Sequence, residues 1–244
     1  MRLLITRPEP DALKLMAALE QHGCAAVVEP LLSVIFNTDA KLDLSDVQAL
    51  VTTSRNALRA LKLHPLRNAA RQLPLFAVGA ATAAEARGLG FGLVLTGAGT
   101  ARELVTHIVA VADPAAGLLL QLAGDLEAID LKAELEAHGF RVVRQVVYRI
   151  DAATMLSVGT IEQLGSGEID GVILMSPRTG AIYAALMRQH RLEAAARELV
   201  HYCLSSRVAE RLAPLGRVPV AVAERPRVEE ILALIDAAAA KSPL

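Results

Sequence analysis

LMAALEQHG at residues 15–23 recurs as LKAELEAHG at residues 131–139. A valine follows each copy at the same distance, Val27 after the first and Val143 after the second. Leucines at i and i+4 lie on one face of a helix. Glycine is a typical helix stop, because it adopts the left-handed cap conformation without a Cβ penalty. The two copies therefore predict the same unit, a helix leading into a strand, in two parts of the chain.

Other segments repeat in the same order. TSRNA at residues 53–57 corresponds to SPRTG at residues 176–180, and Ala83 and Gly90 correspond to Ala209 and Gly216 at the same separation. Matched units that keep their order indicate a tandem duplication.

Short aliphatic runs alternate with Ala- and Leu-rich amphipathic segments along the whole chain. The strand candidates are residues 2–6, 26–29, 49–53, 75–78, 93–96, 118–122, 142–148, 171–176, 201–205 and 218–223. The helix candidates are residues 12–22, 55–63, 82–90, 101–112, 126–138, 180–190, 207–215 and 228–239. Apolar strands separated by helices predict an α/β fold with parallel sheets covered on both faces. Two sheets of about five strands suit this number better than one very wide sheet.

The repeat allows two domain arrangements. Each half of the chain folds alone, or the first β-α-β unit joins the end of the chain and the middle is inserted. We favour the insertion, because the polar segments 37–41 and 149–154 flank the middle of the chain, whereas no break is evident between residues 113 and 118. The expected domains are residues 1–36 with 151–244, and residues 37–150.

The composition excludes several classes of protein. Charged residues make up 21% of the 244 residues and the formal net charge is −1, which argues against a nucleic-acid binder. No apolar stretch approaches the roughly 20 residues that span a bilayer. Two distant cysteines, Cys24 and Cys203, form neither a disulfide framework nor a zinc motif. We therefore expect a cytoplasmic protein that binds neither nucleic acid nor membrane.

Familiar catalytic and metal-binding signatures are missing from the sequence. The six histidines have no metal-ligand spacing, so no metal site is expected. The turn at residues 97–100, Gly-Ala-Gly-Thr, allows a phosphate cradle, although without a following Lys an ordinary turn is the favoured interpretation.

Hydroxyl, arginine and glycine residues gather instead at five predicted strand-to-helix junctions. These begin at Thr6, Thr53, Val78, Ser176 and Ser205. The carboxyl ends of parallel strands are where α/β proteins bind ligands. Each junction also opens a helix, whose free N–H groups attract carboxylates or phosphates. A helix N-cap explains any single junction, but the whole set indicates a cleft for a multiply charged anion.

The ordered set of motifs resembles the uroporphyrinogen-III synthase family over essentially the whole chain. The matching segments are ITRP at residues 5–8, TSRNA at 53–57, VG with Thr82 and Ala83 at 78–83, Val147-Tyr148, and SPR at 176–178. The resemblance implies two similar α/β domains, each a parallel five-stranded sheet flanked by helices, joined by a two-stranded linker. It also implies a monomer without metal or organic cofactor, which closes hydroxymethylbilane into uroporphyrinogen III while inverting the last ring.

The same resemblance supplies candidate site residues. Tyr148 matches the tyrosine that is proposed to help the substrate hydroxyl leave, and a sheet tyrosine is its structural alternative. The candidates for holding the substrate's carboxylates are Thr6, Arg7, Ser54, Arg55, Asn56, Gly79, Thr82, Ser176, Pro177, Arg178, Ser205 and Ser206. Val208 departs from the family pattern, so Ser205 and Ser206 are assigned only by their position. Two other functions stay open, a non-catalytic bilobed anion-binding module and a nucleotide- or sugar-phosphate enzyme centred on residues 97–100.

Overall fold

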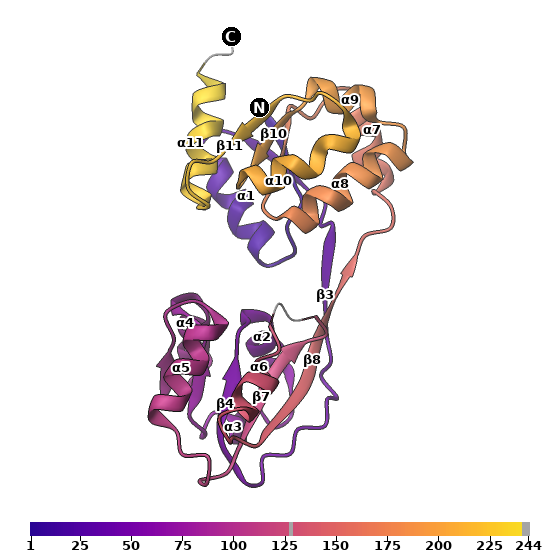
Figure 1. Ribbon diagram of the computed structural model, residues 1–244. Helices are drawn as coiled ribbons and strands as arrows, with labels where there is room; N and C mark the ends of the chain where they lie inside the picture. The colour runs from indigo at the N-terminus through magenta and orange to yellow at the C-terminus, as the bar shows by residue number, and fades with distance from the viewer. Residues whose placement is uncertain (127–128, 241–244) are drawn as a thin grey trace. The chain divides into compact units, whose positions relative to one another are not determined.

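The computed structural model describes residues 1–126 and 129–240, and they form an α/β protein with two sheets (Figure 1). The backbone divides into two compact units. Unit 1 consists of Met1–Ser33 and Asp151–Leu244, and unit 2 consists of Val34–Ile150. The chain therefore passes from one unit to the other within two strands, β3 (Leu32–Phe36) and β8 (Val142–Ala152).

Unit 1 contains a five-stranded sheet with the order β11-β10-β9-β1-β2, in which all neighbours are parallel. Its strands are β1 (Arg2–Ile5), β2 (Ala25–Val28), β9 (Gly171–Leu174), β10 (Val200–Cys203) and β11 (Val220–Val222). Its helices are α1 (Asp11–Gln21), α7 (Val158–Gly165), α8 (Pro177–Gln189), α9 (Glu193–Glu198), α10 (Ser206–Ala209), a 3-10 helix (Glu210–Leu215) and α11 (Val228–Ala239).

Both faces of this sheet are buried, as continuous apolar strands require. Successive side chains of a strand point to opposite faces. Leu3 and Ile5 accordingly pack in a core with α1 and α11, while Leu4 packs in a second core with α7 and α8.

Unit 2 contains a six-stranded sheet with the order β3-β8-β7-β4-β5-β6. Its other strands are β4 (Val47–Thr52), β5 (Leu75–Ala77), β6 (Val94–Thr96) and β7 (Leu118–Gly124). Its helices are α2 (Arg55–Leu63), α3 (Arg67–Ala70), α4 (Ala80–Gly88), α5 (Ala101–Val111) and α6 (Leu131–Glu136). Leu50 faces a core built with α2 and α4, and Ala49 and Val51 face another built with α5 and α6.

The prediction of a parallel, five-stranded second sheet is wrong, because this sheet is mixed and has six strands. The additional strand is β3, which alternates between half-buried and exposed positions at the edge of the sheet beside β8. It lacks the continuous apolar run by which buried strands are recognised. β8 also continues to Ala152, past its predicted end at Tyr148.

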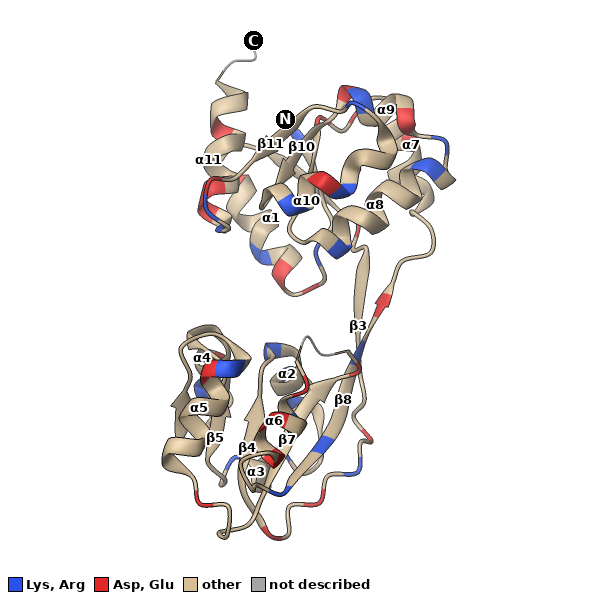
Figure 2. Ribbon diagram, viewed as in Figure 1, with Lys and Arg blue, Asp and Glu red and all other residues tan. Residues whose placement is uncertain are grey.

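Charged residues lie mainly on helices and loops in both units (Figure 2). Among the described residues, no helix is long and apolar enough to cross a membrane.

Candidate active site

A cavity of about 390 Å³ opens at the carboxyl edge of the sheet in unit 2. Its polar lining includes Ser54 and Tyr148, and its apolar lining includes Val78, Leu126 and Ile129. Thr53, Gly99, Ala101 and Gly124 complete the lining. These residues follow β4, β5, β6 and β7, except that Gly124 ends β7 and Tyr148 belongs to β8, so the cavity lies at the carboxyl ends of parallel strands, where α/β proteins bind ligands.

Tyr148 lies against the end of β7. The register pairs Tyr148 with Gly124 after an irregularity between Ala123 and Gly124. A Cβ added to Gly124 would lie 2.6 Å from the Tyr148 Cζ and 2.8 Å from its hydroxyl oxygen. The Tyr148 ring therefore occupies the space that any side chain at position 124 would need, and only 7% of the tyrosine is exposed.

Ser54 lines the same cavity. It is the N-cap of α2, and its Oγ accepts a hydrogen bond from the Asn56 N–H at 3.1 Å. A hydroxyl has one O–H donor besides its acceptor lone pairs. Ser54 can therefore cap the helix and still donate to a carboxylate.

The other candidates of unit 2 lie around the cavity without lining it. Asn56 accepts from Arg59 at 3.0 Å through its side-chain oxygen, and Arg55 precedes it as the first residue of α2. Gly79 is the N-cap of α4, and Thr82 is buried in the first turn of that helix. No side chain caps α4 at Gly79, which leaves its amino end open to an anion.

Two backbones approach closely at Gly79, which explains why this position is a glycine. A Cβ at this position would lie 3.2 Å from the Cα of Gly99 in the next junction. The turn from Gly97 to Thr100 also uses its own donors, because Gly97 N–H donates to Ala77 O and Gly99 N–H to Val78 O. Thr100 and Glu103 form a capping box that places a carboxylate at the amino end of α5. These contacts disfavour the phosphate cradle considered for residues 97–100.

The candidates of unit 1 lie at the carboxyl edge of its own sheet. Ser176 caps α8 by accepting from the Thr179 N–H at 3.1 Å, Pro177 occupies the first turn, and Arg178 is exposed. Ser205 is the N-cap of α10 without a side-chain cap bond, and Ser206 is exposed beside it.

Thr6 and Arg7 are occupied by contacts within the protein. Thr6 is fully buried, and its hydroxyl donates to Ile173 O at 2.7 Å. This hydrogen bond links the end of β1 to β9. Arg7 forms an ion pair with Asp11 at 3.1 Å. The structure thus supplies a protein partner for each of the two side chains.

The cavity also has lining residues that the sequence did not single out. Gly124, Ala101 and the hydrophobic pair Leu126 and Ile129 belong to this group. The sequence motif closest to these residues was the Gly97–Thr100 turn, which contains the lining residue Gly99. Among the described residues, no cluster of histidine, cysteine and carboxylate side chains has the make-up of a metal site.

Comparisons with known proteins decide the family. The model described as "Uroporphyrinogen-III synthase HemD" matches residues 14–233. The chain belongs to the uroporphyrinogen-III synthase family. Its function is that of the family, a lyase of haem biosynthesis that cyclises hydroxymethylbilane with inversion of the terminal ring and loss of water.

Solved structures agree in fold. Uroporphyrinogen-III synthetase from Helicobacter pylori has a TM-score of 0.65 and 17% identity, over 98% of this chain and 100% of the other. A mutant uroporphyrinogen III synthase from Thermus thermophilus has a TM-score of 0.52 and 16% identity, over 99% and 100% of the two chains. A search of curated proteins finds no significant match.

Proposed function

We propose that the cavity at the carboxyl edge of unit 2 is where this uroporphyrinogen-III synthase closes the ring, with Tyr148 as its catalytic residue. The observation that carries the proposal is that Tyr148 and the helix cap Ser54 line one cavity at the carboxyl ends of the parallel strands of unit 2. The two compact units are then the enzyme's two domains, the second inserted in the first. We place the enzyme in the cytoplasm as a monomer that needs no metal or organic cofactor.

Departure of the substrate's terminal hydroxyl is the first step. The pyrrole nitrogen pushes the hydroxyl out as the Tyr148 O–H gives it a proton, which yields water and an electrophilic azafulvene. The substituted carbon of the last pyrrole attacks to form a spiro intermediate. Fragmentation and reclosure turn this ring around, and loss of a proton restores both the pyrrole and the Tyr148 hydroxyl.

The orientation of the bound substrate accounts for most of the selectivity for the inverted product. Left alone, hydroxymethylbilane closes without inversion, so the enzyme must hold the chain with the crowded carbon near the electrophile. Ser54 and the open amino end of α4 at Gly79 suit acetate and propionate groups. Arg55, Asn56 and Thr82 surround this end of the sheet.

We assign further substrate carboxylates to unit 1. Ser176, Pro177 and Arg178 open α8, and Ser205 and Ser206 open α10. Thr6 and Arg7 contribute by shaping the end of β1 through their contacts with Ile173 and Asp11.

An isomer assay tests the proposal. Hydroxymethylbilane is supplied to the protein, and the products are oxidised and separated into inverted and uninverted isomers. We expect the inverted isomer to dominate. Formation of the uninverted isomer alone, at the spontaneous rate, would refute the catalytic assignment and favour a bilobed anion-binding module.

A further inference from the structure

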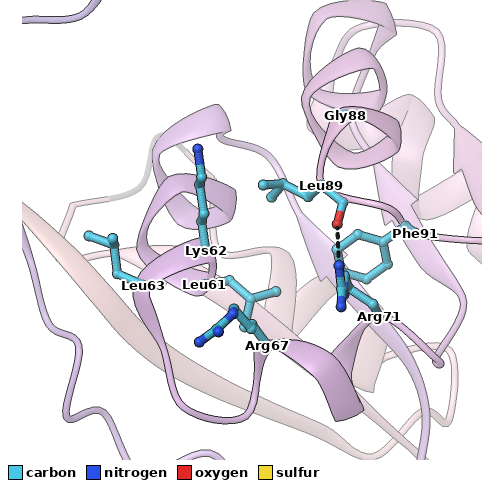
Figure 3. A pocket seen from close by; sticks show the side chains of 8 residues that line it. All are labelled: Leu61, Lys62, Leu63, Arg67, Arg71, Gly88, Leu89 and Phe91. Carbon is cyan, nitrogen blue, oxygen red and sulfur yellow. Dashed lines mark hydrogen bonds between the residues drawn. The ribbon is translucent and has the colours of Figure 1, made fainter.

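Unit 2 has a second cavity, of about 410 Å³, between α2, α3 and α4 (Figure 3). Three cationic side chains line it, Lys62, Arg67 and Arg71. Leu61, Leu89 and Phe91 supply apolar lining. The volume falls within the range of about 300–1,000 Å³ that is usual for small-molecule sites.

This cavity lies at the other edge of the sheet from Tyr148. α2 and α4 each begin directly after a strand and run back along the sheet, so their last turns lie near the amino ends of the strands. The second cavity is lined by these last turns, at Leu61 and Leu89. A ligand bound there would leave the carboxyl edge free for the tetrapyrrole.

The three cations have no carboxylate partner among the described residues. Arg71 donates to Leu89 O at 3.1 Å and also to the side-chain oxygen of Asn68, which fixes its guanidinium. Lys62 and Arg67 are exposed at the mouth. Three positive charges beside an apolar floor have no counter-charge from the described part of the chain.

Helix dipoles explain only two of these cations. Lys62 lies in the last turn of α2 and Arg71 donates to the C-cap residue of α4, and both positions favour a positive charge. Arg67 lies in the four-residue helix α3, which is too short for a helix dipole to account for its charge.

We propose that this cavity binds a small amphipathic anion, with an aromatic or aliphatic body and one acidic group. The body rests on Leu61, Leu89 and Phe91, and the acidic group faces the positive charges of Lys62, Arg67 and Arg71, which line different sides of the cavity (Figure 3). Phe91 is 5% exposed, so it forms a fixed floor for an apolar ring.

Fluorescence titration with 1-anilinonaphthalene-8-sulfonate tests the site, because this probe is an aromatic anion that brightens in apolar surroundings. We expect saturable binding that benzoate or phenyl phosphate displaces. Benzyl alcohol lacks the charge and inorganic phosphate lacks the body, so each should compete at least about tenfold less well. Equal displacement by benzyl alcohol or by inorganic phosphate overturns the proposal.

Three variants locate the probe. Gly88 lines the cavity, and a Cβ at Gly88 meets nothing within 4 Å, so Gly88→Leu adds bulk there without a backbone clash. Gly159 in α7 is equally open, and Gly159→Leu serves as the matched control. We expect Gly88→Leu to abolish binding, Lys62→Gln/Arg67→Gln to weaken it about tenfold, and Gly159→Leu to leave it unchanged. Absent binding in the wild type, or unchanged binding in either cavity variant with a native melting curve, overturns the proposal.

Discussion

In the candidate active site, the ring of Tyr148 packs directly against the backbone of Gly124. The phenol ring lies where a side chain at position 124 would be, and the Gly124 carbonyl accepts a hydrogen bond from Arg144. Glycine at this position lets the ring approach the backbone of β7. Tyr148 could be selected from the sequence because a family motif contains it. Gly124 could not, because its importance arises from an irregular register between two strands.

Tyr148→Phe should slow turnover by up to a few tens of fold, as expected for a modest general-acid contribution. The ring is kept, so the melting temperature should stay close to that of the wild type. Steady-state kinetics and thermal melting of the same preparation measure both effects. An unchanged kcat would remove Tyr148 from the chemistry.

Gly124→Ala should lower kcat by a similar factor, because the new Cβ would lie 2.6 Å from the ring and displace it. Gly165→Ala is the control, since a Cβ there meets nothing within 4 Å. In the Tyr148→Phe background the further loss from Gly124→Ala should shrink, as for residues that act through one another. Fully additive losses would show that Gly124 acts independently of the tyrosine hydroxyl.

At the scale of helices and strands, two of the predicted junctions have serine caps, Ser54 on α2 and Ser176 on α8. Both serines accept from backbone N–H groups of their helices. The repeat paired Ser176 with Thr53, one residue before the cap Ser54. The α/β pattern and most strands were also predictable, since apolar runs mark buried parallel strands. The short helices α3 and α9 and the edge strand β3 were not, because they have no long periodic pattern.

Ser54→Ala and Ser176→Ala should each destabilise the protein by about 1 kcal/mol through loss of a helix cap. Ser54→Ala should in addition raise KM, because Ser54 lines the cavity and its hydroxyl can donate to a substrate carboxylate. Denaturant unfolding and substrate titration separate these effects. Equal stability in wild type and variants would contradict the capping role, and an unchanged KM would place Ser54 outside the substrate site.

At the scale of the whole molecule, stability should depend on pH through His201. This residue is fully buried, with Nδ1 3.0 Å from Pro219 O and Nε2 3.2 Å from the Tyr183 hydroxyl. Burial lowers the pKa of His201 from its ordinary value of 6.5, chiefly by disfavouring the charged form. The folded protein therefore keeps this imidazole neutral at pH values where the unfolded chain takes up a proton.

The free energy of unfolding should consequently fall as the pH drops below 6.5, toward the lowered pKa of folded His201. The slope from one such group is at most about 1.4 kcal/mol per pH unit. His201→Gln keeps hydrogen-bonding groups without titrating, so its unfolding free energy should show a shallower slope across this window. Urea unfolding between pH 7 and pH 5 measures the difference, and parallel curves for the two proteins would contradict the assignment.

The product isomer made by Ala101→Trp tests most directly whether ring closure takes place at the carboxyl edge of unit 2. Ala101 lines that cavity at the start of α5, so an indole there should fill it. With hydroxymethylbilane as substrate and Gly88→Leu as the control in the other cavity, we predict mainly uninverted product from Ala101→Trp and wild-type product from Gly88→Leu. Inverted product at the wild-type rate from a folded Ala101→Trp protein would contradict the account.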